Sequence, residues 1–272
     1  MKRRLWLTSV IILISLILSP LLTAPLAQGS LSAYDPHVLS YGIYWFGLND
    51  ASQKFVPGEP NAYFDPIKPT MLFAHGWQPG ISAIHPPDFT YIEGGNVNTA
   101  NAWINDGWNI GIFYWNQFSD EVAVTDAEAK IWVNDGPQNM RWRKGGGAYE
   151  EAPPGMPSAA ELFYEAYVAA MTEHEYTGGN IRVAGHSLGN QMAMRLTKLV
   201  SDGIDAGTVP ANLLPTRVAL LDPYWSIGPK SYLGEKKTGQ MVREHVAELL
   251  PKGVLFEWYR SSNLTVEPLG DA

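Results

Sequence analysis

Cysteine is absent from the chain, which is 272 residues long. Without thiols the protein cannot contain a cysteine nucleophile, a cysteine-ligated zinc site or an iron–sulfur cluster. It also cannot form disulfide bonds, so its stability must come from a packed core. Hydrophobic residues make up 46% of the sequence and aromatic residues 12%, which suffices for the core of one large domain.

Basic residues are scarce, with 19 Lys and Arg against 27 Asp and Glu, a net charge of −8. A surface with this surplus of negative charge repels phosphate backbones, so nucleic acid is not expected as a partner. No repeat of 20–50 residues is visible, which argues against solenoids and propellers. No H-E-x-x-H motif or comparable ligand cluster is present, so we expect neither a metal site nor a cofactor.

The first 30 residues have the pattern of a secretory signal. Lys2, Arg3 and Arg4 precede an uncharged apolar run, which is followed by the small-residue stretch LLTAPLAQGS. The alternative is an uncleaved anchor, because residues 5–27 are long enough to span a bilayer. We therefore expect an exported protein, either secreted or associated with a membrane through this segment.

From residue 70 onward, short apolar runs alternate with helical patterns. Buried strands are predicted at residues 70–76, 108–116, 180–187, 216–223 and 253–262, and helices at 99–106, 158–174, 188–203 and 239–250. Strands alternating with helices predict an α/β fold with a mostly parallel sheet and helices on both faces. We expect residues 31–272 to form this single domain.

Two segments fall outside the alternation. Residues 31–69 contain a possible leading strand at 38–46 among turns rich in proline and glycine. Residues 133–157 form a long polar insertion. An insertion of this length is either a substrate loop or lid, or a flexible surface loop.

The stretch Gly185-His186-Ser187-Leu188-Gly189 matches G-x-S-x-G, the signature of a nucleophile elbow. In an elbow the serine lies on a sharp strand-to-helix turn, and the two glycines are needed where strand and helix approach closely. The apolar run IRVA precedes the motif and the helical pattern QMAMRLTKLV follows it. Ser187 is therefore the candidate nucleophile, the alternative being an ordinary serine in a tight turn.

Acyl transfer also needs two donors for the oxyanion. The backbone N–H of Leu188, directly after the serine, is one candidate. The second should come from a loop after an upstream strand, and the stretch LFAHGWQPG supplies one, with the Trp77 N–H as candidate donor. We expect His75 to shape this loop through its backbone rather than to act as a base.

The motifs FAHGW, VAGHSLG and ALLDP, in this order, resemble those of secreted α/β-hydrolase lipases of the pancreatic-lipase type. The resemblance covers roughly residues 65–262 and implies ester hydrolysis through an acyl-enzyme, without a catalytic cofactor. It also implies that Asp222, in Leu-Asp-Pro, is the acid of the triad. The alternatives are that Asp222 caps a turn before Pro223, or that Glu267 or Asp271 is the acid.

A serine hydroxyl needs a base, and in this fold the histidine follows the acid. Only His245 follows Asp222, and it lies in the middle of a predicted helix, where a structural role is the simpler interpretation. No motif supports the remaining histidines, His37, His85, His174 and His186. Three hypotheses remain open: the chain lacks the last strand and the catalytic histidine, it uses His245 in an unusual arrangement, or it is a catalytically silent binding protein.

Lipid esters are the substrate class that the resemblance implies. A short-chain carboxylesterase is the nearest alternative enzyme, because one fold carries many chemistries. A silent protein of this fold would instead bind a lipid or a protein ligand.

Overall fold

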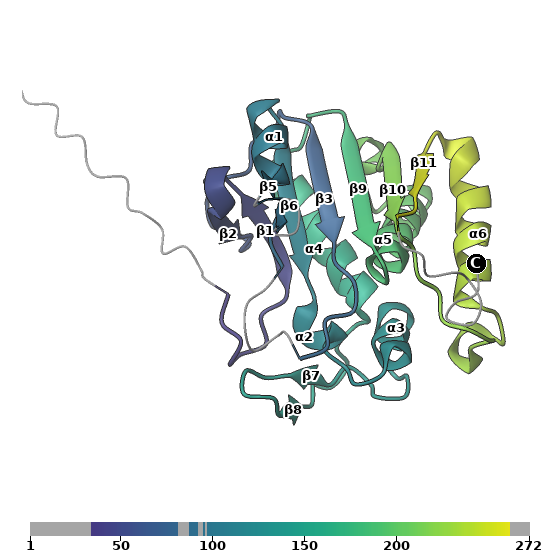
Figure 1. The fold of residues 1–272 in the computed structure, drawn as a ribbon. Coiled ribbons are helices and arrows are strands. Elements are labelled where there is room, and N and C mark those ends of the chain that lie inside the picture. The colour runs from purple at the N-terminus through teal and green to yellow at the C-terminus, as the bar shows by residue number, and fades with distance from the viewer. Residues whose placement is uncertain (1–33, 81–86, 92–94, 96, 262–272) are drawn as a thin grey trace, which may run out of the picture. The chain divides into compact units, whose positions relative to one another are not determined.

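The computed structural model describes residues 34–80, 87–91, 95 and 97–261 (Figure 1). The predicted secretory segment and the alternative acids Glu267 and Asp271 lie outside these residues. Within the described part, no helix is both long and apolar enough to cross a bilayer.

A seven-stranded sheet runs through the domain in the order β11-β10-β9-β3-β6-β1-β2 (Figure 1). Five neighbouring strands are parallel, and two strands at one edge are antiparallel. The parallel strands are β3 (Thr70–Ala74), β6 (Asn109–Tyr114), β9 (Ile181–His186), β10 (Arg217–Leu221) and β11 (Leu255–Tyr259); the antiparallel ones are β1 (Gly42–Phe46) and β2 (Ser52–Lys54). The prediction of a mostly parallel α/β sheet is confirmed.

The strand β6 is mostly apolar without alternation because both of its faces are covered. All six residues of β6 are buried. The long helices α4 (Ala159–Glu173) and α5 (Gly189–Asp205) cover one face of the sheet, and α1 (Thr99–Asn105) lies on the other (Figure 1). Helices on both faces were predicted, and the structure confirms them.

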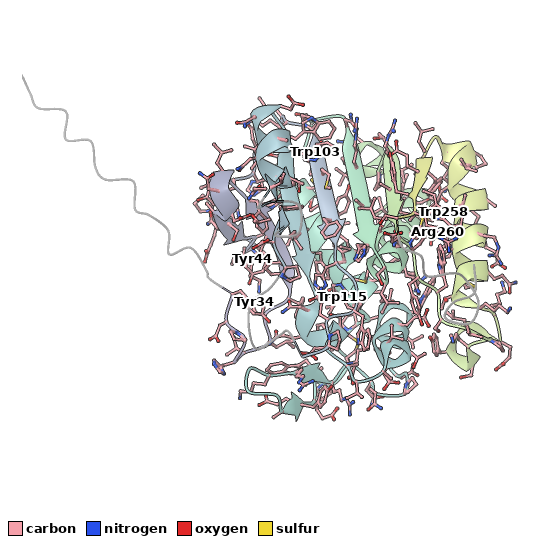
Figure 2. All side chains as sticks on the ribbon, viewed as in Figure 1. Tyr34, Tyr44, Trp103, Trp115, Trp258 and Arg260 are labelled. Carbon is pink, nitrogen blue, oxygen red and sulfur yellow. The ribbon has the colours of Figure 1, made fainter. Side chains whose placement is uncertain are left out.

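The core consists of two clusters, one on each face of the sheet. The larger cluster lies between the sheet and the helices α3 (Val124–Trp132), α4 and α5, and α6 (Thr238–Leu249) packs along α5. The smaller cluster lies under α1 and includes Phe73 and Ile110. Tryptophans contribute to both clusters: Trp115 and Trp132 are buried in the larger one, and Trp103 on α1 packs against the smaller one (Figure 2).

Short elements complete the described chain. They are the helix α2 (Asn116–Ser119), the paired strands β4 (Thr90–Tyr91) and β5 (Val97–Asn98), and the single 3-10 turns Leu48–Asp50, Ala211–Leu213, Ser231–Leu233 and Leu250–Lys252. The helix α4 begins with a capping box, in which the Ser158 hydroxyl accepts from the Glu161 N–H and the Glu161 carboxylate accepts from the Ser158 N–H.

The insertion at residues 133–157 is anchored to the domain. It contains a hairpin of β7 (Trp142–Arg143) and β8 (Tyr149–Glu150). Arg141, directly before the hairpin, places Nη2 2.6 Å from the Glu121 carboxylate, which is fully buried. An ion pair with the buried Glu121 therefore anchors the hairpin, and the sequence alone did not indicate this pair.

The same carboxylate is paired with Lys130 on α3, whose side chain is 2% exposed. Lys130 Nζ lies 2.6 Å from Glu121 Oε1, and it also donates to the carbonyl oxygens of Phe118 and Arg141. Replacing Lys130 with Met removes all three bonds and leaves the buried Glu121 carboxylate with Arg141 as its remaining charged partner among the described residues. We expect the free energy of unfolding to fall by about 3 kcal/mol in urea titrations.

Lys144→Met is the matched control, because the pair of Lys144 with Glu150 has side chains 37% and 44% exposed. An exposed pair contributes little, so the control should lose no more than about 0.5 kcal/mol. Similar losses in the two variants would contradict a structural role for the buried pair.

Candidate active site

Ser187 lies between the end of β9 and the start of α5, at the carboxyl edge of the parallel strands. Its φ is +54°, a left-handed conformation that costs a non-glycine residue energy. Backbone bonds hold it there: the Ser187 N–H donates to the Leu221 carbonyl at 3.1 Å, and its own carbonyl accepts from the Asn190 backbone and side chain. This is the strained turn that a nucleophile elbow requires.

Gly185 and Gly189 allow strand and helix to touch through their backbones. A Cβ on Gly185 would lie 2.1 Å from the carbonyl oxygen of Gly189, and a Cβ on Gly189 would lie 2.0 Å from that of Ala74. No side chain fits at either position. The close approach of β9 and α5 that the motif predicts is therefore present. The start of α5 also lies against the end of β3, at Ala74.

The loop after β3 passes directly over the serine. A Cβ on Gly76 would lie 2.9 Å from Ser187 Cβ and 3.3 Å from Ser187 Oγ. Among the described residues, neither the Trp77 N–H nor the Leu188 N–H donates to an acceptor. The two candidate oxyanion donors thus lie next to Ser187 with their hydrogen-bonding capacity unused.

His75 fixes the direction of this loop. Its Nδ1 lies 2.9 Å from the Gly76 carbonyl oxygen, and its Nε2 accepts from the Trp115 N–H at 3.4 Å. Burial lowers the pKa of His75 to about 4, although the bond to Gly76 opposes that shift and the nearby His186 adds to it. The ring is therefore neutral at pH 7 and donates through Nδ1.

The Gly76 carbonyl and the Trp77 N–H belong to one planar peptide group and point in opposite directions. By holding the Gly76 oxygen, His75 therefore sets the direction of the Trp77 N–H. The expectation that His75 shapes the loop is met through its side chain as well as its backbone.

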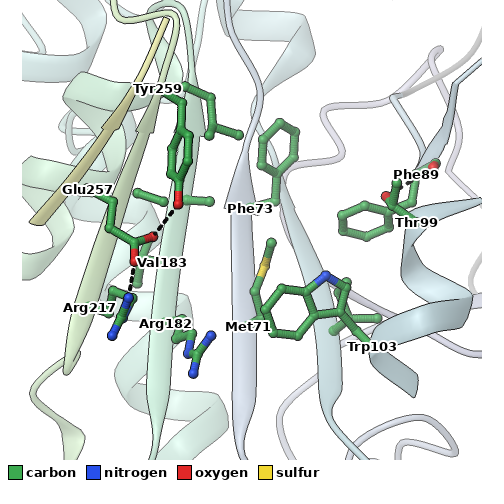
Figure 3. Close-up of a pocket in the computed structure, with 14 residues that line it drawn as sticks. Met71, Phe73, Phe89, Thr99, Trp103, Arg182, Val183, Arg217, Glu257 and Tyr259 are labelled. Carbon is green, nitrogen blue, oxygen red and sulfur yellow. Dashed lines mark hydrogen bonds and ion pairs between the residues drawn. The ribbon is translucent and has the colours of Figure 1, made fainter. Parts of the chain in front are cut away.

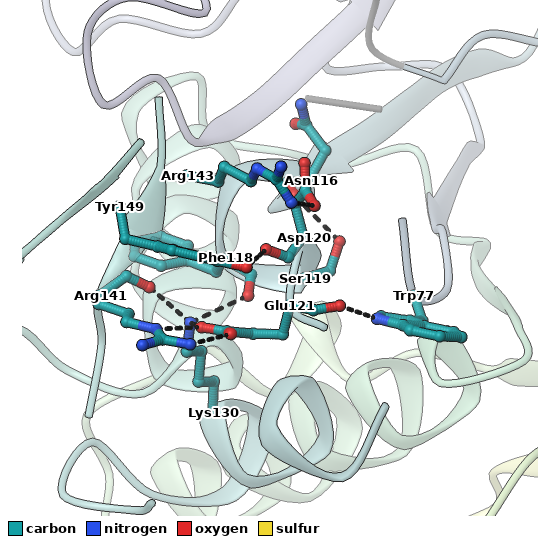
Figure 4. A network of polar contacts seen from close by, with 10 residues as sticks. All are labelled: Trp77, Asn116, Phe118, Ser119, Asp120, Glu121, Lys130, Arg141, Arg143 and Tyr149. Carbon is teal, nitrogen blue, oxygen red and sulfur yellow. Dashed lines mark hydrogen bonds and ion pairs between the residues drawn. The ribbon is translucent and has the colours of Figure 1, made fainter. Parts of the chain in front are cut away.

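A polar network holds the other end of the loop (Figure 4). Trp77 Nε1 donates to the Glu121 carbonyl at 2.7 Å, and the Gly80 N–H donates to Asp120 Oδ1 at 2.6 Å. The same Asp120 oxygen accepts from Arg143 of the hairpin at 3.2 Å. The candidate oxyanion loop and the insertion are therefore bound to one short segment.

The charge of Glu121 is maintained by its partners. Burial would raise the pKa of the Glu121 carboxyl, but bonds and charges from Arg141 and Lys130 outweigh burial and hold it below its ordinary value. Sequence reasoning missed Asp120 and Glu121, because nothing in SDEV indicates partners that lie nine to forty-four residues away.

Asp222 follows β10 and lies beside the elbow. Leu221 is in register with His186, so Asp222 and Ser187 occupy corresponding positions at the ends of neighbouring strands. The Asp222 carboxylate accepts from the Ser261 N–H at 2.6 Å and from the Ser261 hydroxyl. Its φ of +41° departs from strand geometry, as at Ser187. The structure thus brings the candidate acid to the candidate nucleophile.

Desolvation lowers the pKa of His186, and the negative charge of Asp222 opposes that shift. The His186 side chain is exposed at the end of β9. It neighbours the serine in sequence without bonding to the Ser187 hydroxyl.

The structure places His245 on α6, away from Ser187. Its ring is 5.9 Å from that of Trp132, and the charges that act on it include those of Arg195 and Lys198 on α5. Burial, together with the charges of these two cations, lowers the pKa of His245 to about 4. None of its described contacts is with Ser187 or Asp222. In the described part of the chain, no histidine is bonded to the Ser187 hydroxyl.

No cluster of three or more potential metal ligands occurs within residues 34–80, 87–91, 95 and 97–261. His37 and His174, which had no motif support, lie apart from the elbow: His37 is exposed near Gly145, and the His174 ring packs 5.5 Å from that of Phe64. His85 lies outside the described residues.

No family model and no curated protein sequence matches the chain. In structure it is similar to esterase 2 of Thermogutta terrifontis phosphorylated by paraoxon, with 12% identity, a TM-score of 0.36 and 75% of each chain covered. It is similar to a thioesterase domain from the curacin biosynthetic pathway, with 10% identity, a TM-score of 0.30, and 79% of this chain and 55% of that chain covered. It is also similar to esterase B from Lactobacillus rhamnosis, with 13% identity, a TM-score of 0.30, and 71% of this chain and 50% of that chain covered.

The lowered pKa of His245 predicts a pH dependence of stability. In the unfolded chain this histidine takes up a proton below its ordinary pKa of 6.5, whereas in the folded protein it does so only near 4. Its contribution is therefore complete above pH 6.5 and is lost as the pH falls towards 4. Between pH 7 and pH 5 the loss should be about 2 kcal/mol.

Urea unfolding at both pH values tests this. His245→Leu should lose about 2 kcal/mol less than the wild type over this interval, whereas His37→Leu, at an exposed position, should behave like the wild type. An unchanged pH dependence in His245→Leu would contradict the assignment.

Proposed function

We propose that the protein is a serine hydrolase that cleaves carboxylic esters. The observation that carries the proposal is a strained Ser187 next to the Gly76–Trp77 loop, where the backbone N–H groups of Trp77 and Leu188 have no acceptor among the described residues. Such donors stabilise charge that develops on a carbonyl oxygen in the transition state. The positive end of the α5 dipole adds to this stabilisation.

In the proposed reaction, Ser187 Oγ attacks the ester carbonyl carbon while a base takes the hydroxyl proton. The carbonyl oxygen becomes the oxyanion and accepts from Trp77 and Leu188. The alcohol then leaves with the proton, and an acyl-enzyme remains on Ser187. Water, activated by the same base, releases the carboxylic acid. Asp222 would orient the base and stabilise its protonated form.

The base of this mechanism is not His245 in the described arrangement. A histidine with a pKa near 4 is a weak base at pH 7, and its described contacts are with α3 and α5 residues. We therefore propose that the base comes from outside the described residues. We expect this base to lie next to Asp222.

Lipid esters are the proposed substrate class, supported by the likeness of FAHGW, GHSLG and LLDP to lipase motifs. Turnover of tributyrin that rises sharply above its solubility limit would support a lipase. Saturation on soluble p-nitrophenyl butyrate without such a rise would favour a short-chain esterase. We further propose export, on the pattern of residues 1–30, and sequencing of the mature N-terminus tests it.

The second candidate is a binding protein that no longer catalyses. It is favoured by one observation, that the Ser187 hydroxyl has no histidine partner among the described residues. This candidate predicts lipid or protein binding without turnover, unaffected by Ser187→Ala.

Hydrolysis of p-nitrophenyl butyrate, with and without added imidazole, separates the two candidates. The enzyme should hydrolyse the ester at least a hundredfold faster than Ser187→Ala, which removes the nucleophile. Ser231→Ala, at an exposed serine, should leave the rate unchanged. Asp222→Asn should lower kcat a hundredfold or more, because the base loses its orienting charge.

Imidazole can act as an external base at an otherwise complete elbow. A rate that depends on Ser187 only when imidazole is present would place the base outside this chain and would still support the proposal. If no hydrolysis depends on Ser187 in either condition, the proposal is wrong and the binding protein is favoured.

A further inference from the structure

A cavity of about 520 Å³ lies on the face of the sheet opposite α5 (Figure 3). Strands β3, β9, β10 and β11 form its floor, and Phe73 and Trp103 stand on one side of it. Glu257 and Tyr259 of β11 stand on the other side. Its lining includes neither Ser187 nor Gly76, so it is distinct from the candidate active site.

The cavity exists because small residues lie between large ones. Ala184 of β9 is in register with Phe73 of β3, and with Ala219 of β10. Ala219 in turn is in register with Glu257 of β11. Two neighbouring alanines thus form a low floor between an aromatic wall and the side chains of β11. Among the described helices on this face, α1 packs mainly against β6.

The two ends of the cavity differ in charge. Arg182 and Arg217 are in register on neighbouring strands and lie at one end, whereas Tyr259 lies at the other (Figure 3). Arg217 is paired with Glu257, which also accepts from the Tyr259 hydroxyl at 3.2 Å. Glu257 is therefore the acidic residue that lines the cavity, and it is already bonded to Arg217 and Tyr259.

Arg182 has no carboxylate partner among the described residues, and its buried Nε has no acceptor there. Its guanidinium instead lies over the Trp108 ring, 4.6 Å from the centroid, and 5.7 Å from that of Trp103. These cation–π contacts hold the guanidinium in place, and none of its N–H groups donates to an acceptor among the described residues. An arginine so placed binds a carboxylate through two parallel hydrogen bonds.

We propose that this cavity binds a monocarboxylate with an unbranched apolar chain, with the carboxylate on Arg182 and the chain over Ala184 and Ala219. The strand from Arg217 to Leu221 rises about 13 Å over four residue steps. A saturated chain of about ten carbons, with C–C bonds of about 1.5 Å, has a similar length. The volume and apolar lining are those of a small-molecule site with a single orienting charge.

This site does not depend on the proposed hydrolysis. The ligand resembles the acid that cleavage of a lipid ester releases, yet its carboxylate would lie at the end of the cavity away from Tyr259, and Tyr259 is the residue whose carbonyl contacts Asp222. Binding should therefore persist when the nucleophile is removed.

Isothermal titration of the full chain with decanoate, below its micellar concentration, tests the proposal. We expect binding of one decanoate per chain. Arg182→Gln should weaken it at least tenfold, because the charge-assisted bonds are lost. Ala219→Phe should abolish it by filling the floor. Arg243→Gln, at an exposed arginine, and Ser187→Ala should bind like the wild type.

1-Decanol has the same chain without the charge, so its affinity should not change between wild type and Arg182→Gln. Three results would overturn the proposal. One is that the folded chain does not bind decanoate, and another is that Arg182→Gln and Ala219→Phe both bind it as the wild type does. The third is binding that disappears in Ser187→Ala, which would place the ligand at the elbow. Light scattering that shows a dimer broken by Ala219→Phe would instead assign the cavity to a second copy of this chain.

Discussion

The arrangement of the candidate site depends on one backbone contact, where Gly185, Gly189 and the carbonyl of Ala74 meet without side chains between them. This contact lets α5 begin directly against the ends of β9 and β3, which forces Ser187 into its left-handed conformation. It also sets how closely the loop after β3 can pass over the serine. The position of Ser187 and the position of the candidate oxyanion donors thus both follow from this one steric constraint.

The candidate site also requires that the loop after β3 is held in one conformation. Hydrogen-bond donors stabilise the charge of a transition state only when they are already oriented towards it. The neutral ring of His75 holds one end of the loop, and the Asp120–Glu121 segment holds the other. Buried charges of this kind contribute little net stability, but removal of one partner is costly. The network around Lys130 therefore specifies one geometry for the loop and joins the insertion at residues 133–157 to it.

Much of the fold could be predicted from the sequence, because apolar runs and helix caps are local signals. The strand predicted at 108–116 is β6 at Asn109–Tyr114, and the helix predicted at 239–250 is α6 at Thr238–Leu249. The leading strand predicted from residue 38 begins only at Gly42, since apolar continuity does not reveal where pairing with a neighbour starts. Contacts between distant residues were not predictable, and the anchoring of the insertion on Glu121 is the clearest case. The identity of the base could not be predicted, because a helical pattern places His245 on a helix but does not show which residues lie beside it.

The central claim is that Ser187 is an activated nucleophile. Incubation of the 272-residue chain with a fluorophosphonate, followed by peptide mass spectrometry, tests it most directly, because these probes react with serines that a base has activated. The account predicts one adduct, on Ser187, which is absent from Ser187→Ala. A folded chain that forms no adduct even with added imidazole, or that forms it on another serine, would contradict the account.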